Sequence, residues 1–170
     1  ILSMFKVMAD DDSVNALWYS DDIAFNTGLL MSPEVLRIYF FPWLKAIGDL
    51  ASASGKPLIY HSDGVLFDVL DDIMDCRVNA LHPVEPKAMD IRKVRQKAGN
   101  RLALIGNLDV GDILTRGTPE SVRQAVRRNL SWMEGTPGYC LGSGNSIPEY
   151  VPIENYRAML EAAFEFGGGR

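Results

Sequence analysis

The chain has 170 residues, the length of one ordinary domain, and its 47% hydrophobic and 23% charged residues exclude a disordered or fibrous protein. Its net charge of −5 disfavours nucleic acid and anionic membranes as partners, because both bind basic surfaces. Two cysteines are too few for a disulfide framework, and no apolar run approaches the length of a membrane span. We therefore expect a cytoplasmic protein that acts on a small molecule.

Short apolar runs alternate with helical patterns along the chain. Residues 1–9 form an uncapped helical face, so we expect the chain to begin inside a fold. We predict strands at 16–20, 57–61, 78–82, 102–106 and 139–141, each followed by polar residues, glycine or proline. We predict further helices at 32–51, with a kink at Pro42, and at 65–74, 88–98, 118–133 and 153–166, with a frayed tail at 167–169.

Alternating strands and helices indicate an α/β protein with a parallel sheet. The sheet is either open and doubly wound or an arc of a (β/α)8 TIM barrel, since five strands are too few to close that barrel. No glycine-rich nucleotide-binding sequence follows a strand, which disfavours the open sheet. Polar residues after each strand favour the barrel, because catalytic groups gather at its mouth.

The segment His61-Ser62-Asp63-Gly64 is the sharpest candidate site. Residues two apart on extended backbone point to the same side, so His61 and Asp63 are expected to share one pocket. An imidazole and a carboxylate there would act as an acid–base pair or as metal ligands. In the structural alternative, Asp63 caps the next helix and His61 bonds to backbone. Only two histidines occur, which excludes a histidine-rich metal site.

Two further strand ends carry polar side chains. His82 either supplies a ligand or a substrate hydrogen bond, or fills a corner between strand and loop. Asp21 and Asp22 are neighbours that point to opposite sides, so at most one of them faces the mouth.

The last two strand ends leave alternatives open. Asn107 and Asp109 either bind a ligand or stabilise their own turn. The loop at 142–148 either binds an anion through its backbone or is flexible. Cys76 and Cys140 are interpreted as packed thiols rather than nucleophiles.

Several short motifs occur together in family-like order and spacing. They are Asp21-Asp22-Ile23-Ala24-Phe25-Asn26-Thr27-Gly28, His61-Ser62-Asp63-Gly64, Leu104-Ile105-Gly106-Asn107-Leu108-Asp109, Gly117-Thr118-Pro119-Glu120 and Val151-Pro152-Ile153-Glu154-Asn155. In these motifs, their order and their spacing, the chain resembles the uroporphyrinogen decarboxylase superfamily. The resemblance implies a (β/α)8 barrel, of which residues 1–170 form the C-terminal part with about strands four to eight.

The resemblance implies two reaction classes. Decarboxylases of the superfamily remove carboxylates from tetrapyrrole acetate side chains without a cofactor, whereas cobalamin-dependent methyltransferases use zinc to activate a thiol. The methyltransferase zinc motif is His-x-Cys-Gly with a later cysteine. His61 and Gly64 match it, but Asp63 replaces the first cysteine, and Asn145 or Gly144 stands at the later position. We expect zinc to be absent, or to bind weakly through His61, Asp63 and an unidentified third ligand.

The sequence therefore predicts a uroporphyrinogen decarboxylase-like enzyme first, and a corrinoid-dependent methyltransferase of the same superfamily second. His61 is expected to donate a proton or bind a metal, Asp63 to orient it, and Asp22 to place a charge in the pocket. The residues expected to bind substrate are Asn107, Asp109, His82 and Asn145. A third interpretation is an inactive half-barrel, because the strands at 16–20 and 139–141 would be open edges that need another copy or a missing N-terminal half.

Overall fold

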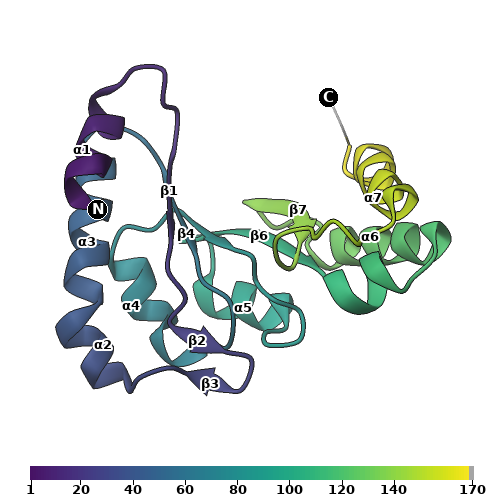
Figure 1. Cartoon of the computed structure of the whole chain (residues 1–170), viewed down its shortest axis with the longest axis horizontal. Helices are drawn as coiled ribbons and strands as arrows, with labels where there is room; N and C mark the ends of the chain where they lie inside the picture. Colours follow the sequence, from purple (N-terminus) through teal and green to yellow (C-terminus); the bar gives the residue numbers. More distant parts are fainter. Residues whose placement is uncertain (169–170) are drawn as a thin grey trace.

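A computed structural model, which describes residues 1–168, places the five predicted strands in one parallel sheet (Figure 1). The strands are β1 (Leu17–Ser20), β4 (Leu58–His61), β5 (Ala80–His82), β6 (Ala103–Leu108) and β7 (Tyr139–Ser143). Their spatial order is the order of the sequence, β1-β4-β5-β6-β7. A doubly wound sheet reverses its strand order at one point. This sheet does not, and it is the predicted partial barrel.

Helices follow the strands in the predicted alternation. They are α1 (Leu2–Asp10), α2 (Pro33–Tyr39), α3 (Phe41–Ala53), α4 (Leu70–Asp75), α5 (Ile91–Ala98), α6 (Pro119–Trp132) and α7 (Ile153–Phe166). In Figure 1, α1, α2 and α3 lie at one end of the molecule and α6 and α7 at the other, so the first and last helices are far apart. Within residues 1–168, no helix has the length and apolar character needed to cross a membrane.

The alternation of buried side chains along β4 shows which face of the sheet the helices cover. Leu58 and Tyr60 are fully buried in the core, together with Leu44 and Ile47 of α3. Ile59 and His61 alternate with them and are only partly buried. Because side chains of a strand alternate between its faces, His61 belongs to the face that the helices do not cover.

The predicted helix at 32–51 is two helices that meet at Phe40. Pro42 lies in the first turn of α3, where its missing N–H costs no helical hydrogen bond, so the predicted kink is a complete break. The predicted helix at 65–74 is a 3₁₀ turn (Phe67–Val69) followed by α4, and the one at 88–98 begins only at Ile91, after the Asp90 cap. Gly169 of the predicted tail lies outside the described residues.

Two small elements were not predicted, and one of them shapes the site. A hairpin of β2 (Ala24–Phe25) and β3 (Gly28–Leu29) follows β1. Val65 donates a backbone hydrogen bond to the Phe25 carbonyl over 2.9 Å, which fixes this hairpin against the loop after β4. The second element is a π-helix (Val110–Thr115) after β6.

Candidate functional site

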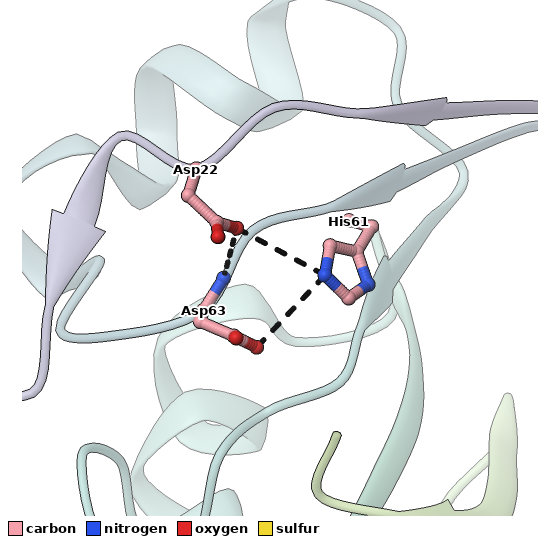
Figure 2. A group of neighbouring side chains, drawn as sticks. All are labelled: Asp22, His61 and Asp63. Carbon is pink, nitrogen blue, oxygen red and sulfur yellow. Dashed lines mark hydrogen bonds and ion pairs between the residues drawn. The ribbon is translucent and has the colours of Figure 1, made fainter. Parts of the chain in front are cut away.

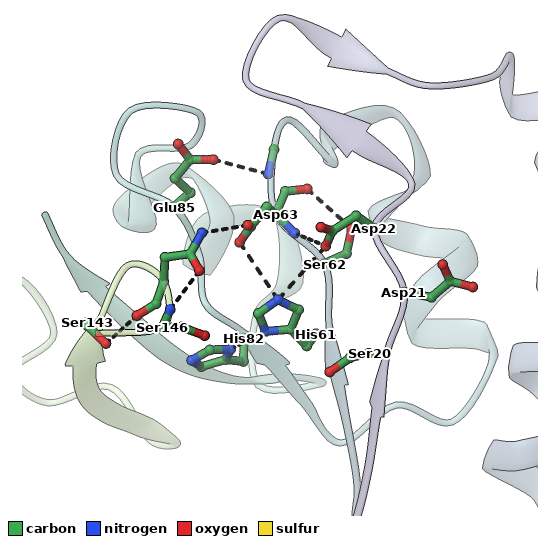
Figure 3. A network of polar contacts seen from close by, with 12 residues as sticks. Ser20, Asp21, Asp22, His61, Ser62, Asp63, His82, Glu85, Ser143 and Ser146 are labelled. Carbon is green, nitrogen blue, oxygen red and sulfur yellow. Dashed lines mark hydrogen bonds and ion pairs between the residues drawn. The ribbon is translucent and has the colours of Figure 1, made fainter. Parts of the chain in front are cut away.

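The sheet register brings the ends of three strands into one row. Ser20, His61 and His82 are paired across β1, β4 and β5, so their side chains leave the same face at the carboxyl end of the sheet. The His61 and His82 rings are stacked with centroids 4.9 Å apart, and their Nδ1 atoms lie 2.7 Å from each other. Figure 3 shows this pair at the base of a polar network.

Asp22 and Asp63 face the opposite nitrogen of His61 (Figure 2). His61 Nε2 lies 3.9 Å from Asp22 Oδ1 and 3.9 Å from Asp63 Oδ1. The Asp63 backbone N–H donates to Asp22 Oδ1 over 2.9 Å, which links the loop after β1 to the loop after β4. The structure thus brings His61 and Asp63 into one site, and Asp22 joins them. Asp21 instead accepts a hydrogen bond from Tyr19, away from this site.

Tight backbone packing fixes Asp63 in place. Gly64, directly after it, has φ +86°, and a Cβ atom there would overlap with the Phe25 carbonyl of the hairpin. The Gly64 N–H donates to Glu85 over 3.3 Å, which adds a third carboxylate near the site (Figure 3). The predicted helix-capping role of Asp63 is not observed, because Leu66 precedes the next helical turn without a side-chain cap.

Asp63 is the most unusual carboxylate of the site. Its Oδ2 accepts a hydrogen bond from the Asn145 amide over 2.6 Å. Its Oδ1 is buried and, within the described residues, has no hydrogen-bond partner. Burial raises the pKa of Asp63, and the nearby charge of Asp22 raises it further, against smaller lowering effects of Asn145 and His61. A buried oxygen beside a second carboxylate is an arrangement that a cation would stabilise.

His82 is a neutral partner for His61. Burial lowers the pKa of His82 to about 4, and the adjacent His61 lowers it in the same direction. The Trp18 ring packs against His82 with centroids 4.9 Å apart. His82 therefore contacts the site through His61, rather than merely filling a corner.

Asn145 joins the site from the last strand. Besides binding Asp63, it accepts a hydrogen bond at Oδ1 from the Ser146 N–H over 2.6 Å. The Gly144 N–H donates to the Leu108 carbonyl over 2.6 Å. Two of the backbone donors proposed for anion binding are therefore occupied within the protein, and the loop is held by them.

Asn107 differs from its prediction. Its side chain is buried, and its amide donates to the carbonyls of Val84 and Met89 over 2.8 and 3.4 Å. Both amide hydrogens are used by the fold, so this group does not donate to a substrate. Asp109 caps the π-helix by accepting from the Asp112 N–H, and it lies 3.7 Å from Lys87. Asp109 thus stabilises its own turn, whereas the Asn107 amide holds the separate segment of Val84 and Met89.

Two hollows open on the site. Asp22, Asp63 and Glu85 contribute to a pocket of about 300 Å³ beside the hairpin. Glu85, Asn145 and Asp109 contribute to a neighbouring cleft of about 500 Å³. A small molecule in either hollow would reach a carboxylate or amide of the site.

The two cysteines lie outside this site. Cys76 is buried, and burial raises its pKa to about 11. Cys140 is exposed, so it is not the packed thiol that was predicted.

The cluster of Asp22, His61 and Asp63 offers three ligand atoms for a divalent metal ion. One ligand atom from each residue lies within 4.8 Å of the other two. Bonds from zinc to nitrogen or oxygen are about 2.0–2.2 Å long, so ligand atoms about 3–4 Å apart can share one ion. The buried Asp63 Oδ1, which has no hydrogen-bond partner among residues 1–168, supplies an independent reason for a cation at this position.

Comparison with known proteins gives the family. The model of the family "Uroporphyrinogen decarboxylase (URO-D)" matches residues 4–166. The chain belongs to the uroporphyrinogen decarboxylase family. The resemblance seen in the short motifs is therefore confirmed.

Named relatives of the family include two kinds of enzyme. A methylated-thiol–coenzyme M methyltransferase from Methanosarcina mazei is 35% identical over 136 residues, which cover 80% of this chain and 34% of the relative. A uroporphyrinogen decarboxylase from Methylococcus capsulatus is 36% identical over 77 residues, covering 45% of this chain and 21% of that enzyme. The chain thus spans about a third or less of these curated relatives.

A solved structure supports the fold. A methyltransferase from Methanosarcina mazei superimposes with a TM-score of 0.76 and 24% sequence identity, covering 98% of this chain and 47% of that one. At this identity the match shows the fold, which is the barrel arc of the family. It does not by itself separate the two kinds of enzyme.

Sequence reasoning missed one member of this site. Glu85 was not singled out as a site residue, although it follows the His82 strand end by three positions. Asp22 was expected as a charge in the pocket, while the third ligand position beside His61 and Asp63 was left unidentified; in the structure Asp22 offers an oxygen at that position. A signal was present, because Asp22 follows β1 just as Asp63 follows β4, its neighbour in the sheet.

Proposed function

We propose that this chain forms the metal-binding part of a methyltransferase of the family, with a divalent ion held by Asp22, His61 and Asp63. One observation carries the proposal: the buried Oδ1 of Asp63, without a hydrogen-bond partner in residues 1–168, lies 3.9 Å from the Nε2 of His61. Both atoms have lone pairs available for a cation once Nε2 is unprotonated.

The relatives support the same choice. The methyltransferase relative aligns over 136 residues, whereas the decarboxylase relative from Methylococcus capsulatus aligns over 77 at nearly equal identity. The sequence alone ranked the decarboxylase first on the motif Gly106-Asn107-Leu108-Asp109 and the name of the family, since the missing thiolate ligands of the zinc motif favour neither class. The arrangement of Asp22 beside His61 and Asp63 compensates for one of those ligands with an oxygen.

Each residue of the proposed site has a separate role in binding the ion and the thiol. An ion at this site would lower the pKa of a bound thiol, which would then attack a methyl group as thiolate. Asp22 and Asp63 provide the negative charge that attracts the ion, and His61 provides a nitrogen ligand. Asn145 holds Asp63 by Oδ2 over 2.6 Å, so that Oδ1 stays directed at His61. The acceptor thiol would enter through the pocket of about 300 Å³ beside Asp22. The corrinoid partner remains a prediction from the resemblance.

Zinc binding measured by competition with a chromophoric chelator tests the site. We expect His61→Ala and Asp63→Asn to weaken zinc binding at least tenfold, because each removes one of about three protein ligands. Asp21→Asn is the matched control, since this neighbouring carboxylate faces Tyr19 and not His61. Unchanged binding in His61→Ala, or binding that Asp21→Asn weakens equally, would contradict the proposed site.

Activity assays then test the reaction. In the whole protein that contains this chain, transfer of a methyl group from a methylated thiol to a thiol acceptor should stop on metal removal. It should return when zinc is added back. Methyl transfer that persists at full rate after metal removal would contradict the proposal.

A second candidate, a metal-free decarboxylase, is favoured by the raised pKa of Asp63. A carboxyl group whose pKa is raised beside an imidazole is a candidate acid for protonating the carbon from which carbon dioxide leaves. Decarboxylation of uroporphyrinogen with a chelator present, followed by chromatography of the products, distinguishes the two. Turnover under these conditions that His61→Ala abolishes would favour the decarboxylase.

A further inference from the structure

His61 and His82 share a single proton at their contact. Their Nδ1 atoms lie 2.7 Å apart, a distance at which one nitrogen must donate and the other accept. Two N–H groups at this distance would point at each other, and two lone pairs would repel. The tautomers of the two rings are therefore coupled, whichever ring holds the proton.

Two arrangements of the pair satisfy this condition. In the first, His61 donates from Nδ1, so that its Nε2 presents a lone pair toward Asp22 and Asp63. In the second, His82 donates from Nδ1, so that His61 Nε2 carries a hydrogen and faces the two carboxylates as a donor, 3.9 Å from each. Only the first arrangement permits His61 to bind a metal ion through Nε2.

We propose that His82 is a positioning residue, which accepts the Nδ1 hydrogen of His61 and so directs the Nε2 lone pair to the site between Asp22 and Asp63. This inference rests on the proposed metal site. It assigns to His82 the part that a carboxylate or carbonyl commonly plays behind a metal-binding histidine.

The surroundings hold the His82 ring in place for this part. Adjacent register on β4 and β5 sets the two histidines side by side, and the Ser62 N–H donates to the His82 carbonyl over 3.0 Å. Trp18 covers the His82 ring, and its indole N–H is itself fixed by Ser20 over 2.9 Å (Figure 3 shows Ser20 beside the pair). A ring held by its neighbours keeps its Nδ1 at the position from which it accepts.

The change from the second arrangement to the first conserves protons. When the metal-free pair is in the second arrangement, His61 Nε2 loses its proton to solvent, and the proton on His82 Nδ1 passes to His61 Nδ1. His82 Nε2 then takes up one proton from solvent. Both rings are neutral before and after, so the pair changes tautomer without a net change of charge.

Substitutions at position 82 separate the hydrogen bond from packing. His82→Asn places Oδ1 near the position of Nδ1 and can accept from His61, whereas His82→Leu fills the space and cannot accept. We expect His82→Leu to weaken zinc binding about 10–100-fold and His82→Asn to stay within about threefold of the unchanged protein. If His82→Leu binds zinc normally while His61→Ala does not, the metal site stands and the role of His82 is wrong. If His61→Ala also binds normally, the proposed site itself is wrong.

The tautomers can be read directly, without any substitution that might impair folding. In the protein labelled with ¹⁵N-histidine and loaded with zinc, two-bond ¹H–¹⁵N spectra report which ring nitrogen carries hydrogen. We expect His61 protonated at Nδ1 and His82 protonated at Nε2. A zinc-loaded spectrum with the hydrogen on His82 Nδ1 would overturn the proposal.

Discussion

Asn145 donates its side-chain amide to Oδ2 of Asp63 over 2.6 Å, although 82 residues separate them in the chain. Asp63 follows β4 and Asn145 follows β7, with β5 and β6 between these strands in the sheet. In a flat sheet, the loops after β4 and β7 would be too far apart for this contact. In the arc of a barrel, the sheet curves and brings both loops to one mouth. This hydrogen bond therefore joins the two ends of the site.

The first prediction concerns this bond. Asn145→Ala removes a donor that favours the ionised form of Asp63, so the already raised pKa of Asp63 should rise further. We expect the loss of zinc binding to be greatest at low pH and to shrink as the pH rises, because Asp63 is then ionised in both proteins. Ser146→Ala is the control, because Ser146 contacts Asn145 through its backbone N–H. A loss of binding that is independent of pH would contradict this explanation.

The second prediction concerns the stability of the fold at low pH. The pKa of His82 falls from 6.5 to about 4 on folding, so the unfolded chain binds a proton that the folded one refuses between these values. Stability must therefore fall as pH decreases from about 6.5 to 4. Because the ring is partly exposed, we expect a loss of about 2 kcal/mol rather than the full value of the shift.

Urea unfolding at several pH values measures this loss. His82→Asn removes the titrating group, so its stability relative to the unchanged protein should rise as the pH falls. The comparison cancels Asp63, whose raised pKa acts in the opposite sense. Parallel pH profiles for the two proteins would show that folding does not lower the pKa of His82, and would contradict this prediction.

The strands and most helices were predictable because each is a local pattern. The strand that ends at His61 was placed within one residue at its start, since Leu58 to Tyr60 form a short apolar run before a polar loop. The hairpin at Ala24–Leu29 was not predicted, because strands of two residues leave no alternation to detect. The π-helix at Val110–Thr115 escaped for a similar reason, as Gly111 and Asp112 resemble a turn.

The contacts of the site were less predictable, because they depend on register and curvature. The spacing of His61 and Asp63 indicates a shared side within one segment. The contact of His61 with His82 instead depends on how β4 pairs with β5, which no local pattern determines. For Asn107 the local pattern was misleading. A polar residue at the end of a strand suggests a substrate-binding group, but the Asn107 amide donates to the carbonyls of Val84 and Met89.

The third prediction tests that structural role of Asn107. Asn107→Ala leaves two buried carbonyls without their donor and places a Cβ-bearing residue without a polar side chain at φ +73°. We expect a loss of about 3 kcal/mol in the free energy of unfolding, with zinc binding of the folded protein unchanged. Asn107→Gly, which tolerates this backbone angle, should lose about 1 kcal/mol less. Weakened zinc binding at normal stability would restore the predicted role in the site.

The last prediction concerns Gly106, which precedes Asn107 in β6. It has φ +110°, and a Cβ atom there would overlap with the backbone carbonyl of Pro83, which cannot move aside as a flexible side chain can. That carbonyl also accepts the Asn107 N–H over 3.1 Å, so any shift would disturb β6 beside the His82 strand. We expect Gly106→Ala to destabilise the protein by more than about 3 kcal/mol. Gly55→Ala is the matched control: Gly55 also has a positive φ, +69°, but its Cβ would meet no atom within 4 Å. This control should lose only about 1 kcal/mol, the cost of the backbone angle alone.

Thermal and urea unfolding of the Gly106→Ala and Gly55→Ala variants measure the difference in stability. Equal losses in the two variants would show that the contact with Pro83 does not constrain the strand.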